Sequence, residues 1–345
     1  MIDVTVMGGG AFGLSVAYAC AARGAKVRVI EKRYIGAGSS GGVVGALAPH
    51  VPENWNPKKE FQFQSLIMAQ DFWDGVQAQS GISPGYARAG RLQAVADARG
   101  LELAHQRVGT AADLWRGKAT WQVLSAAERD AWQPVSASGY LIHDSLSARM
   151  HPRMACESLA GAVRALGGEI VIGDGPVEGQ VVWATGYEGL LALSEAVGRP
   201  VGNGVKGQAL SLRHDARGKP QLFVDGLHII PHDDGTVAIG STSEREFNTS
   251  DGTDSQLDVL HERALAACPV LQGAPVLARW AGVRPRAKSR APMLGKWPGR
   301  AGHFIANGGF KIGFGMAPKM AGVMADLVLE GRDDIPDGFR VEDSF

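Results

Sequence analysis

Residues 2–32 constrain the fold of this chain more than any other stretch. An apolar run at residues 2–6 ends in a glycine cluster, residues 14–22 suit a helix that Gly24 stops, and residues 27–30 form a second apolar run. A short strand, a helix and another short strand in this order predict a β-α-β unit. The sequence therefore predicts an α/β fold.

The glycines of this unit are spaced for a dinucleotide. Gly8, Gly10 and Gly13 satisfy G-x-G-x-x-G, and Glu31 ends the second strand, near the spacing expected of an acid that holds a ribose. Gly8 permits a tight turn, Gly10 lets backbone N–H groups approach a pyrophosphate, and Gly13 lets the helix pack close to the strand. The helix N-terminus supplies partial positive charge to the anion. We therefore predict a dinucleotide site at this turn.

The size and charge of the chain limit the other possibilities. At 345 residues it is long enough for about two domains. Lys and Arg together number 35, as do Asp and Glu, so the chain has no basic excess for nucleic acid or an anionic membrane. It has no apolar run of ~18 residues, and its first strand starts at residue 2, which predicts a cytoplasmic protein without a membrane span. Its three cysteines lie far apart in apolar contexts, so we expect buried, reduced thiols and no metal site among them.

Later stretches suggest where further parts of the site lie. Residues 34–49, dense in glycine and serine, predict a backbone that wraps closely around a ligand. A short apolar strand that ends in Ala184, Thr185 and Gly186 offers a second place where backbone reaches a nucleotide. The pattern also predicts helices at 58–79, 101–115, 126–132 and 318–330, a hairpin that pairs 227–231 with 236–240, and a polar tail after residue 331 on the surface.

Two segments near the C-terminus carry candidate substrate residues. Arg284 follows a predicted strand and precedes a proline, which fixes the local backbone. A planar guanidinium held in this way suits bidentate capture of a carboxylate; a structural ion pair at a strand end is the alternative. Residues 305–320 form a glycine-rich turn that opens a helix, and its N-terminal N–H groups would stabilise negative charge, as on a reduced cofactor ring.

Taken in order, these motifs resemble the D-amino acid oxidase superfamily, in particular its glycine oxidase and sarcosine oxidase-like members. The motifs are GGGAFG with Glu31, GSSGGVVGALAP, WATGY, LHIIPHDDGTVAIGST, GVRP and NGGFKIGFGMAP, spread over residues 6–325. The resemblance implies a Rossmann-type FAD-binding domain with an interleaved α+β substrate domain that contains an antiparallel sheet, and it implies FAD rather than NAD. We predict the FAD-binding domain at 1–50, 140–203 and 281–345, and the substrate-binding domain at 51–139 and 204–280.

The resemblance also implies which residues contact the cofactor. It places Val177 near the adenine, Ser39 and Ser40 near the phosphates, and Ala46 and Leu47 beside the flavin ring. The complete predicted set of cofactor contacts is Gly8, Gly10, Ala11, Phe12, Gly13, Glu31, Lys32, Ser39, Ser40, Ala46, Leu47, Val177, Ala184, Thr185, Gly186, Gly309, Phe310, Lys311, Ile312 and Gly313.

Three residues are candidates for the chemistry itself. Arg284 matches the arginine that such enzymes use for a substrate carboxylate. Lys311 stands where glycine oxidase-like members commonly carry a second arginine. A lysine keeps the positive charge but lacks the planar guanidinium that can hold a carboxylate through two parallel hydrogen bonds. Lys311 either holds a carboxylate, lies by flavin N5 and assists oxygen reduction, or is solvated. His50 either contacts the substrate or the flavin, or is structural.

The reaction that the resemblance implies is oxidation of the amine carbon of an amino acid or N-alkyl amino acid. Hydride passes to flavin N5, and the imine is then hydrolysed, as in oxidases of glycine, D-amino acids and sarcosine. A flavin dehydrogenase of the same family, which passes electrons to a quinone or a carrier instead of oxygen, is the principal alternative. An NAD-dependent dehydrogenase and a non-catalytic flavin-binding module are less favoured.

Overall fold

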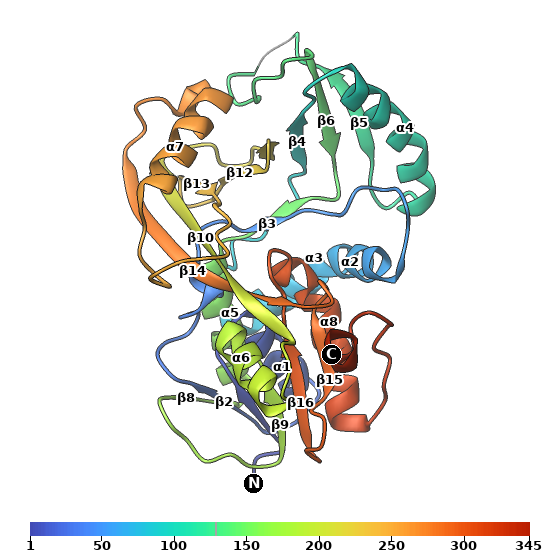
Figure 1. Ribbon diagram of the computed structural model, residues 1–345, viewed down its shortest axis with the longest axis vertical. Coiled ribbons are helices and arrows are strands. Elements are labelled where there is room, and N and C mark those ends of the chain that lie inside the picture. Colours follow the sequence, from blue (N-terminus) through green and yellow to red (C-terminus); the bar gives the residue numbers. More distant parts are fainter. Residues whose placement is uncertain (128–129) are drawn as a thin grey trace.

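The computed structural model describes residues 1–127 and 130–345, and two sheets form its framework (Figure 1). One sheet has six strands in the order β15-β16-β9-β1-β2-β8, and the other has eight in the order β14-β10-β13-β12-β11-β4-β6-β5. A short ribbon joins β3 (Ala46–Leu47) to β7 (Ala148–Arg149). This is the mixed α/β architecture that the sequence predicts.

The six-stranded sheet is centred on the first strand of the chain. β1 (Val4–Met7) is parallel to β2 (Val27–Glu31) on one side and to β9 (Gln180–Trp183) on the other. β8 (Glu169–Ile172) lies beyond β2 and β16 (His303–Asn307) beyond β9, with β15 (Met293–Lys296) antiparallel at the edge. The chain leaves β1 toward β2 and later returns to β9, so the strand order reverses beside β1. In open α/β sheets, ligands bind in the crevice at the carboxyl ends of the strands at such a reversal.

Helices bury the apolar strands of this sheet. α1 (Ala11–Ala21) packs against both α5 (Pro152–Ala165) and α8 (Gly313–Glu330), and α6 (Gly186–Ala196) contacts β16. α2 (Pro57–Ile67) lies on α8, and α3 (Ala69–Ser80) lies on α5. The three cysteines, two of them in these helices, are buried free thiols, which confirms the expectation of buried residues.

Two helices differ from their predicted extents. The helix predicted at 58–79 is two helices, because α2 and α3 pack against different partners and the chain bends at Met68 between them. The helix predicted to begin at Pro318 begins at Gly313, and Pro318 lies buried inside it. Proline removes a helical hydrogen bond there, and the next N–H, that of Lys319, donates to Ser65 Oγ of α2 at 3.2 Å.

The helix predicted at 126–132 partly lies outside the described residues. Of the residues described there, 126–127 form a bend and 131–132 a turn. The predicted hairpin is confirmed as β12 (Leu227–Pro231) paired with β13 (Thr236–Gly240).

The eight-stranded sheet is antiparallel apart from one pair. Its other strands are β4 (Arg91–Ala94), β5 (Trp121–Ser125), β6 (Tyr140–Asp144), β10 (Gly202–Arg213), β11 (Gln221–Val224) and β14 (Val276–Ala287). The parallel pair is β4 with β11, which joins segments far apart in the sequence. α4 (Ala98–Leu114) packs on β5, and α7 (Ser255–Ala267) packs on β10, β12 and β13. Short 3₁₀ turns occupy Ser39–Gly41, Pro269–Leu271 and Val341–Ser344.

The two long strands β10 and β14 connect the two halves of the molecule (Figure 1). They run through the predicted domain limits at 203/204 and 280/281, and β6, which was predicted to belong to the FAD-binding domain, pairs with β4 and β5. The domain limits remain a proposal, and this pairing favours placing the limit predicted at 139/140 after β6 instead of before it. The end of β14 docks on the turn before α8, because Phe310 N donates to Pro285 O at 2.9 Å.

The tail after residue 331 lies mostly on the surface, as predicted, but a few buried side chains anchor it. Phe339 is fully buried and its ring lies 4.7 Å from that of Phe61. Leu294 N of β15 donates to Phe339 O at 2.7 Å. Within residues 1–127 and 130–345, no helix is long and apolar enough to cross a membrane.

Candidate active site

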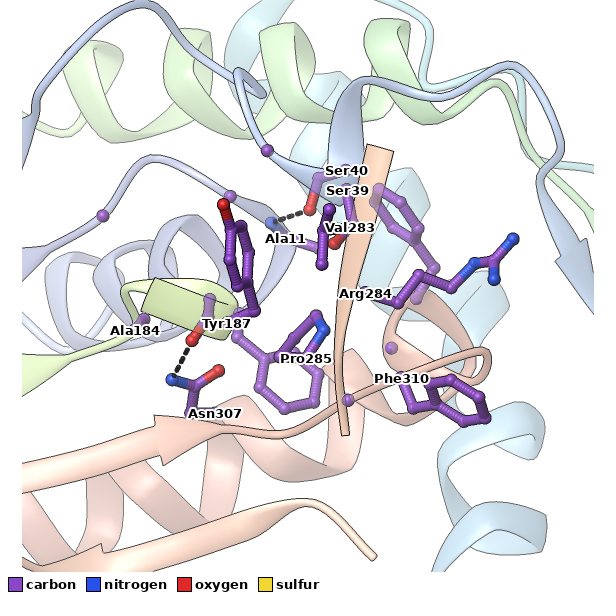
Figure 2. A pocket seen from close by; sticks show the side chains of 18 of the residues that line it. Ala11, Ser39, Ser40, Ala184, Tyr187, Val283, Arg284, Pro285, Asn307 and Phe310 are labelled. Atoms are coloured by element: carbon purple, nitrogen blue, oxygen red, sulfur yellow. Dashed lines mark hydrogen bonds between the residues drawn. The ribbon is translucent and has the colours of Figure 1, made fainter. Parts of the chain in front are cut away.

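The turn after β1 has the close packing that its glycines predict. Gly8 has a φ of +109°, and a Cβ on Gly13 would lie 2.0 Å from Gly8 O, so α1 can sit this close to the strand only with glycine. No side chain caps the helix at Gly10, and Ala11 N donates to Ser40 Oγ at 2.9 Å (Figure 2). Gly10 itself therefore leaves the start of α1 without a cap, and this helix N-terminus favours an anion such as a pyrophosphate.

Glu31 is fixed at the end of β2 beside this turn. One of its carboxylate oxygens accepts from Gly9 N at 2.7 Å, and the other accepts from Arg33 N at 3.0 Å. Gly173 and Asp174, which follow β8, line the same cavity. Val177, the predicted adenine contact, does not line it and is 49% exposed, because the chain turns at Gly173 and leaves the edge of the sheet. We therefore move the proposed adenine contact to Gly173 and Asp174.

Residues 34–49, which follow Glu31, connect the part of the cavity beside the turn after β1 to the rest of the cavity. Ser39, Ser40 and Ala46 line the cavity, whereas Leu47 is 1% exposed in the core. Successive side chains of a strand point to opposite faces, so the prediction that both residues of β3 lie beside the flavin is not supported for the Leu47 side chain. A Cβ on Gly45 would lie 1.9 Å from Met150 O, so the segment lies directly against the chain that follows β7.

A single continuous cavity of about 1060 Å³ contains the predicted residues. All of the predicted cofactor and substrate residues line it except Gly13, Leu47 and Val177. Ligand pockets usually measure about 300–1,000 Å³, so this one has room for a large cofactor together with a small substrate. The cavity contains the N-terminus of α1 and the Glu31 carboxylate, and it extends from Glu31 to Arg284. These features fit an extended dinucleotide.

Arg284 projects from β14 (Figure 2), lines this cavity, and contacts Ser241 and Thr242, which follow β13. Its side chain is 8% exposed. Nη2 donates to Ser241 Oγ at 2.6 Å, and both terminal nitrogens approach Thr242 O, at 3.3 and 3.4 Å. Burial lowers the pKa of Arg284 to about 10, with the charge of Glu244 opposing the shift, so the guanidinium is protonated at neutral pH.

A buried polar network supports the segment that contacts Arg284. Thr242 Oγ1 donates to Glu244 Oε1, which also accepts from Gln208 Nε2 at 3.1 Å. Glu244 Oε2 pairs with Lys206 Nζ at 3.5 Å, and both side chains are almost fully buried. The Glu244 carboxylate therefore forms its ion pair with Lys206, and the hydrogen bonds of Arg284 go to uncharged oxygens.

The turn before α8 brings Lys311 to the same chamber. Asn307 Nδ2 donates to Gly186 O at 2.8 Å, and Gly308 N donates to Asn307 Oδ1 at 2.8 Å, which ties this turn to the start of α6 (Figure 2). Lys311 lines the cavity, and its pKa is lowered by burial and then by the positive charges of Arg284 and Arg286. The turn therefore adds a second cation beside Arg284.

His50 is held at the cavity wall by Gln62. Gln62 Nε2 donates to Ala48 O at 3.2 Å, so its Oε1 is the acceptor, and His50 N donates to it at 2.8 Å. His50 Nδ1 lies beside the same oxygen and must carry its proton, which leaves Nε2 as the unprotonated ring nitrogen. Burial is the largest cause that lowers the pKa of His50, so the ring is neutral near pH 7.

Several cavity residues were not among those predicted from the sequence. Arg91, Phe223 and His228 line the substrate end, and Tyr187 and Asn307 line the cofactor end. The available signal for Arg91 was a charged residue next to the apolar Leu92, and the signal for His228 was its place inside the predicted hairpin. Neither signal says which face of the sheet the residue occupies.

A dinucleotide cleft of this kind, open to a chamber with a buried arginine, defines an oxidoreductase that uses a dinucleotide cofactor. A family model described as DAO, FAD dependent oxidoreductase, matches residues 3–327. The chain belongs to this family, so it is an FAD-dependent oxidoreductase. The predicted cofactor is confirmed, and the NAD-dependent and non-catalytic interpretations are set aside.

Two relatives and one solved structure illustrate the similarity. The glycine oxidase of Pseudomonas putida is 27% identical over 368 residues, which covers 97% of this chain and 96% of that protein. The bifunctional protein ThiO/ThiG of Trichormus variabilis is 26% identical, and the match covers 96% of this chain but only 53% of that protein. The crystal structure of glycine oxidase from Geobacillus kaustophilus has a TM-score of 0.84 at 22% identity, with 98% of each chain covered.

Proposed function

We propose that this protein oxidises the amine carbon of an amino acid or N-alkyl amino acid, and that Arg284 binds the carboxylate of the substrate. The observation that carries the proposal is the position of Arg284 in one cavity with the dinucleotide cleft. Its guanidinium is buried, yet among the described residues its hydrogen bonds go to the neutral oxygens of Ser241 and Thr242. A buried cation of this kind gains from an anionic ligand, and a charge-assisted hydrogen bond contributes about 1.5–3 kcal/mol.

The charges around the chamber suit an amine that must lose its proton. The ammonium form of the substrate cannot release hydride, and the positive charges of Arg284 and Lys311 favour the neutral amine. His50 lines the same cavity with an unprotonated Nε2, which makes it a candidate acceptor for that proton. Catalysis in this proposal depends on charge placement and orientation more than on a strong protein base.

When bound, FAD would supply the acceptor for the α-hydrogen of the substrate and its electron pair. Arg284 orients the substrate through its carboxylate. The oxidised substrate is an imine, which water hydrolyses to a carbonyl compound and an amine. Glycine, sarcosine and D-amino acids are the first candidates, because the Pseudomonas putida relative is named a glycine oxidase.

Oxygen consumption by the purified holoprotein tests the proposal. The panel contains glycine, sarcosine, D- and L-amino acids and cyclic imino acids, with peroxide measured in the same samples. We expect one class of amine to consume oxygen and yield peroxide, and we expect Arg284→Ala to raise its KM steeply while FAD stays bound. Reduction of an artificial electron acceptor without peroxide would identify a dehydrogenase instead, and no turnover with any amine and either acceptor would refute the proposal.

A further inference from the structure

The chamber has a second polar wall, separate from the Arg284 side. β11 and β12 pair so that Phe223 lies opposite His228, and β4 pairs with β11 so that Phe223 lies opposite Gln93. Arg91 is two residues before Gln93 and so projects from the same face of the sheet. Arg91, Phe223 and His228 therefore share one face, and all three line the cavity.

Arg91 is held so that part of its guanidinium has no protein acceptor. The side chain is 5% exposed, its Nε donates to Asp144 Oδ2 at 2.9 Å, and its Cζ lies 5.5 Å from the centre of the Phe223 ring. Asp144 also accepts from Ser147 N at 2.8 Å, which fixes the carboxylate. Within the described residues, neither terminal nitrogen of Arg91 has a hydrogen-bond acceptor. Asp144 balances the charge of Arg91 and orients it, and two donors remain available to the cavity.

His228 completes this wall, and Lys311 lies near both His228 and Arg284. His228 Nδ1 is buried without a hydrogen-bond partner in the described part of the chain. Burial, with the positive charges of Arg91 and Lys311, lowers the pKa of His228 to about 3, so the ring is neutral at physiological pH. The charged groups that shift the pKa of Lys311, among those described, are both cations, Arg284 and Arg286. Lys311 thus supplies positive charge that no carboxylate in the described residues balances.

We propose that Arg91, His228 and Lys311 form a second anion-binding subsite, and that the preferred substrate is a dicarboxylic amine of about the size of glutamate or an N-carboxyalkyl glycine. Arg284 holds the carboxylate next to the reacting carbon, and the second subsite holds the distal carboxylate. This inference rests on the proposed oxidation at Arg284. An amino acid with a single carboxylate needs only the Arg284 cation. The second subsite explains why the chamber also contains Lys311, whose charge no carboxylate in the described residues balances.

The spacing of the two subsites agrees with such a substrate. Arg284 contacts Ser241, which directly follows β13, whereas Arg91 stacks over Phe223 of β11. These strands are separated by β12 alone. Neighbouring strands lie about 4.8 Å apart, so the backbones of β13 and β11, beside which the two guanidinium groups are held, lie roughly 10 Å apart. Each contact between a guanidinium and a carboxylate takes up a few ångströms of this separation. The remainder leaves room for a chain of several bonds between the two carboxylates of one substrate.

Binding of two non-oxidisable ligands to the holoenzyme tests the inference. Glutarate and butyrate have similar length and differ in one carboxylate, and their dissociation constants follow from calorimetric titration or from the flavin absorption change. We expect glutarate to bind at least about tenfold more tightly than butyrate, which corresponds to about 1.4 kcal/mol. We expect Lys311→Met to reduce that ratio severalfold, Lys311→Arg to keep it, and the control Lys288→Met, an exposed lysine that does not line the cavity, to leave it unchanged.

A second variant addresses Arg91 without leaving a buried charge alone. Removal of one partner of a buried pair costs about 3–5 kcal/mol, so Arg91→Gln is combined with Asp144→Asn. The paired variant should also lower the glutarate-to-butyrate ratio. Equal binding of the two ligands by the wild-type protein, or a ratio that Lys311→Met leaves unchanged, overturns the subsite.

The same protein separates failure of the subsite from failure of the proposed function. Flavin reduction by an amine together with equal binding of glutarate and butyrate refutes the subsite and supports the amine oxidation. A glutarate preference that Lys311→Met abolishes, without flavin reduction by glutamate, 2-aminobutyrate or iminodiacetate under anaerobic conditions, supports the subsite and contradicts the oxidation.

Discussion

The substitution Gly207→Ala tests the role of Arg284 without changing Arg284 itself. The guanidinium lies directly over Gly207, and an ideal Cβ at this position would be 1.7 Å from Nη2 and 2.3 Å from Cζ of Arg284. Real Cβ atoms essentially never approach another heavy atom within 3.0 Å, so the guanidinium must withdraw by about 1 Å or more. The three nearest atoms all belong to this one flexible side chain, so we expect the strand to remain intact.

The displacement should affect substrate binding far more than the cofactor. A misplacement of about 1 Å at a reacting centre can cost on the order of 10²-fold. We therefore expect kcat/KM for the amine substrate to fall about 10- to 100-fold, mainly through KM, which corresponds to about 1.4–2.7 kcal/mol. FAD content and Tm should stay close to those of the wild-type protein.

Steady-state kinetics on matched variants provide the assay. Gly109→Ala in α4 is the control, because a Cβ there meets no heavy atom within 4 Å. A KM for Gly207→Ala equal to that of the control, with normal FAD content, would refute the assignment of Arg284 to the substrate carboxylate.

Three further predictions concern the cofactor, stability and pH. Gly13→Ala should yield a protein that loses FAD on gel filtration, because its Cβ would lie 2.0 Å from Gly8 O, a backbone atom; retention of FAD would contradict this. Glu244→Ala should lower the free energy of unfolding by about 3–5 kcal/mol, since it leaves buried Lys206 unpaired, and a denaturant titration measures the loss. Burial lowers the pKa of His232 to about 4 from its ordinary 6.5. Between pH 6.5 and pH 4, His232 is therefore protonated in the unfolded chain but neutral in the folded protein. Tm should fall as pH drops from 6.5 toward 4, and the change of Tm with pH should be smaller in His232→Asn.

The cofactor end of the site could be predicted because its determinants are local. Gly8, Gly10 and Gly13 lie within one turn, and the packing they allow depends on backbone atoms of that same turn. Arg284 was predicted for a similar reason, since its proline neighbour and the preceding strand are adjacent in the chain. In both places, the signal that picked out the residues is local in the sequence.

The substrate end could not be predicted in the same way because its residues meet through long-range pairing. Arg91 approaches His228 only because β4 joins the distant strand β11 in parallel, which no local pattern indicates. Val177 does not line the cavity, because the spacing of a loop does not define where the chain leaves the sheet edge. Phe339 was expected in a polar tail, yet its buried ring packs against Phe61 and, together with buried Ile335 and Val341, anchors that tail.

Anaerobic flavin reduction in a single turnover tests the central claim most directly. Purified yellow holoprotein is mixed with the amine that gives the fastest turnover, and with the same amine deuterated at the α-carbon, while the flavin absorbance is followed. The account predicts that the flavin bleaches, that the deuterated amine bleaches it more slowly, and that one imine-derived carbonyl compound appears for each flavin. Bound FAD that no amine reduces, or bleaching without a carbonyl product, would contradict the claim that this protein oxidises an amine carbon.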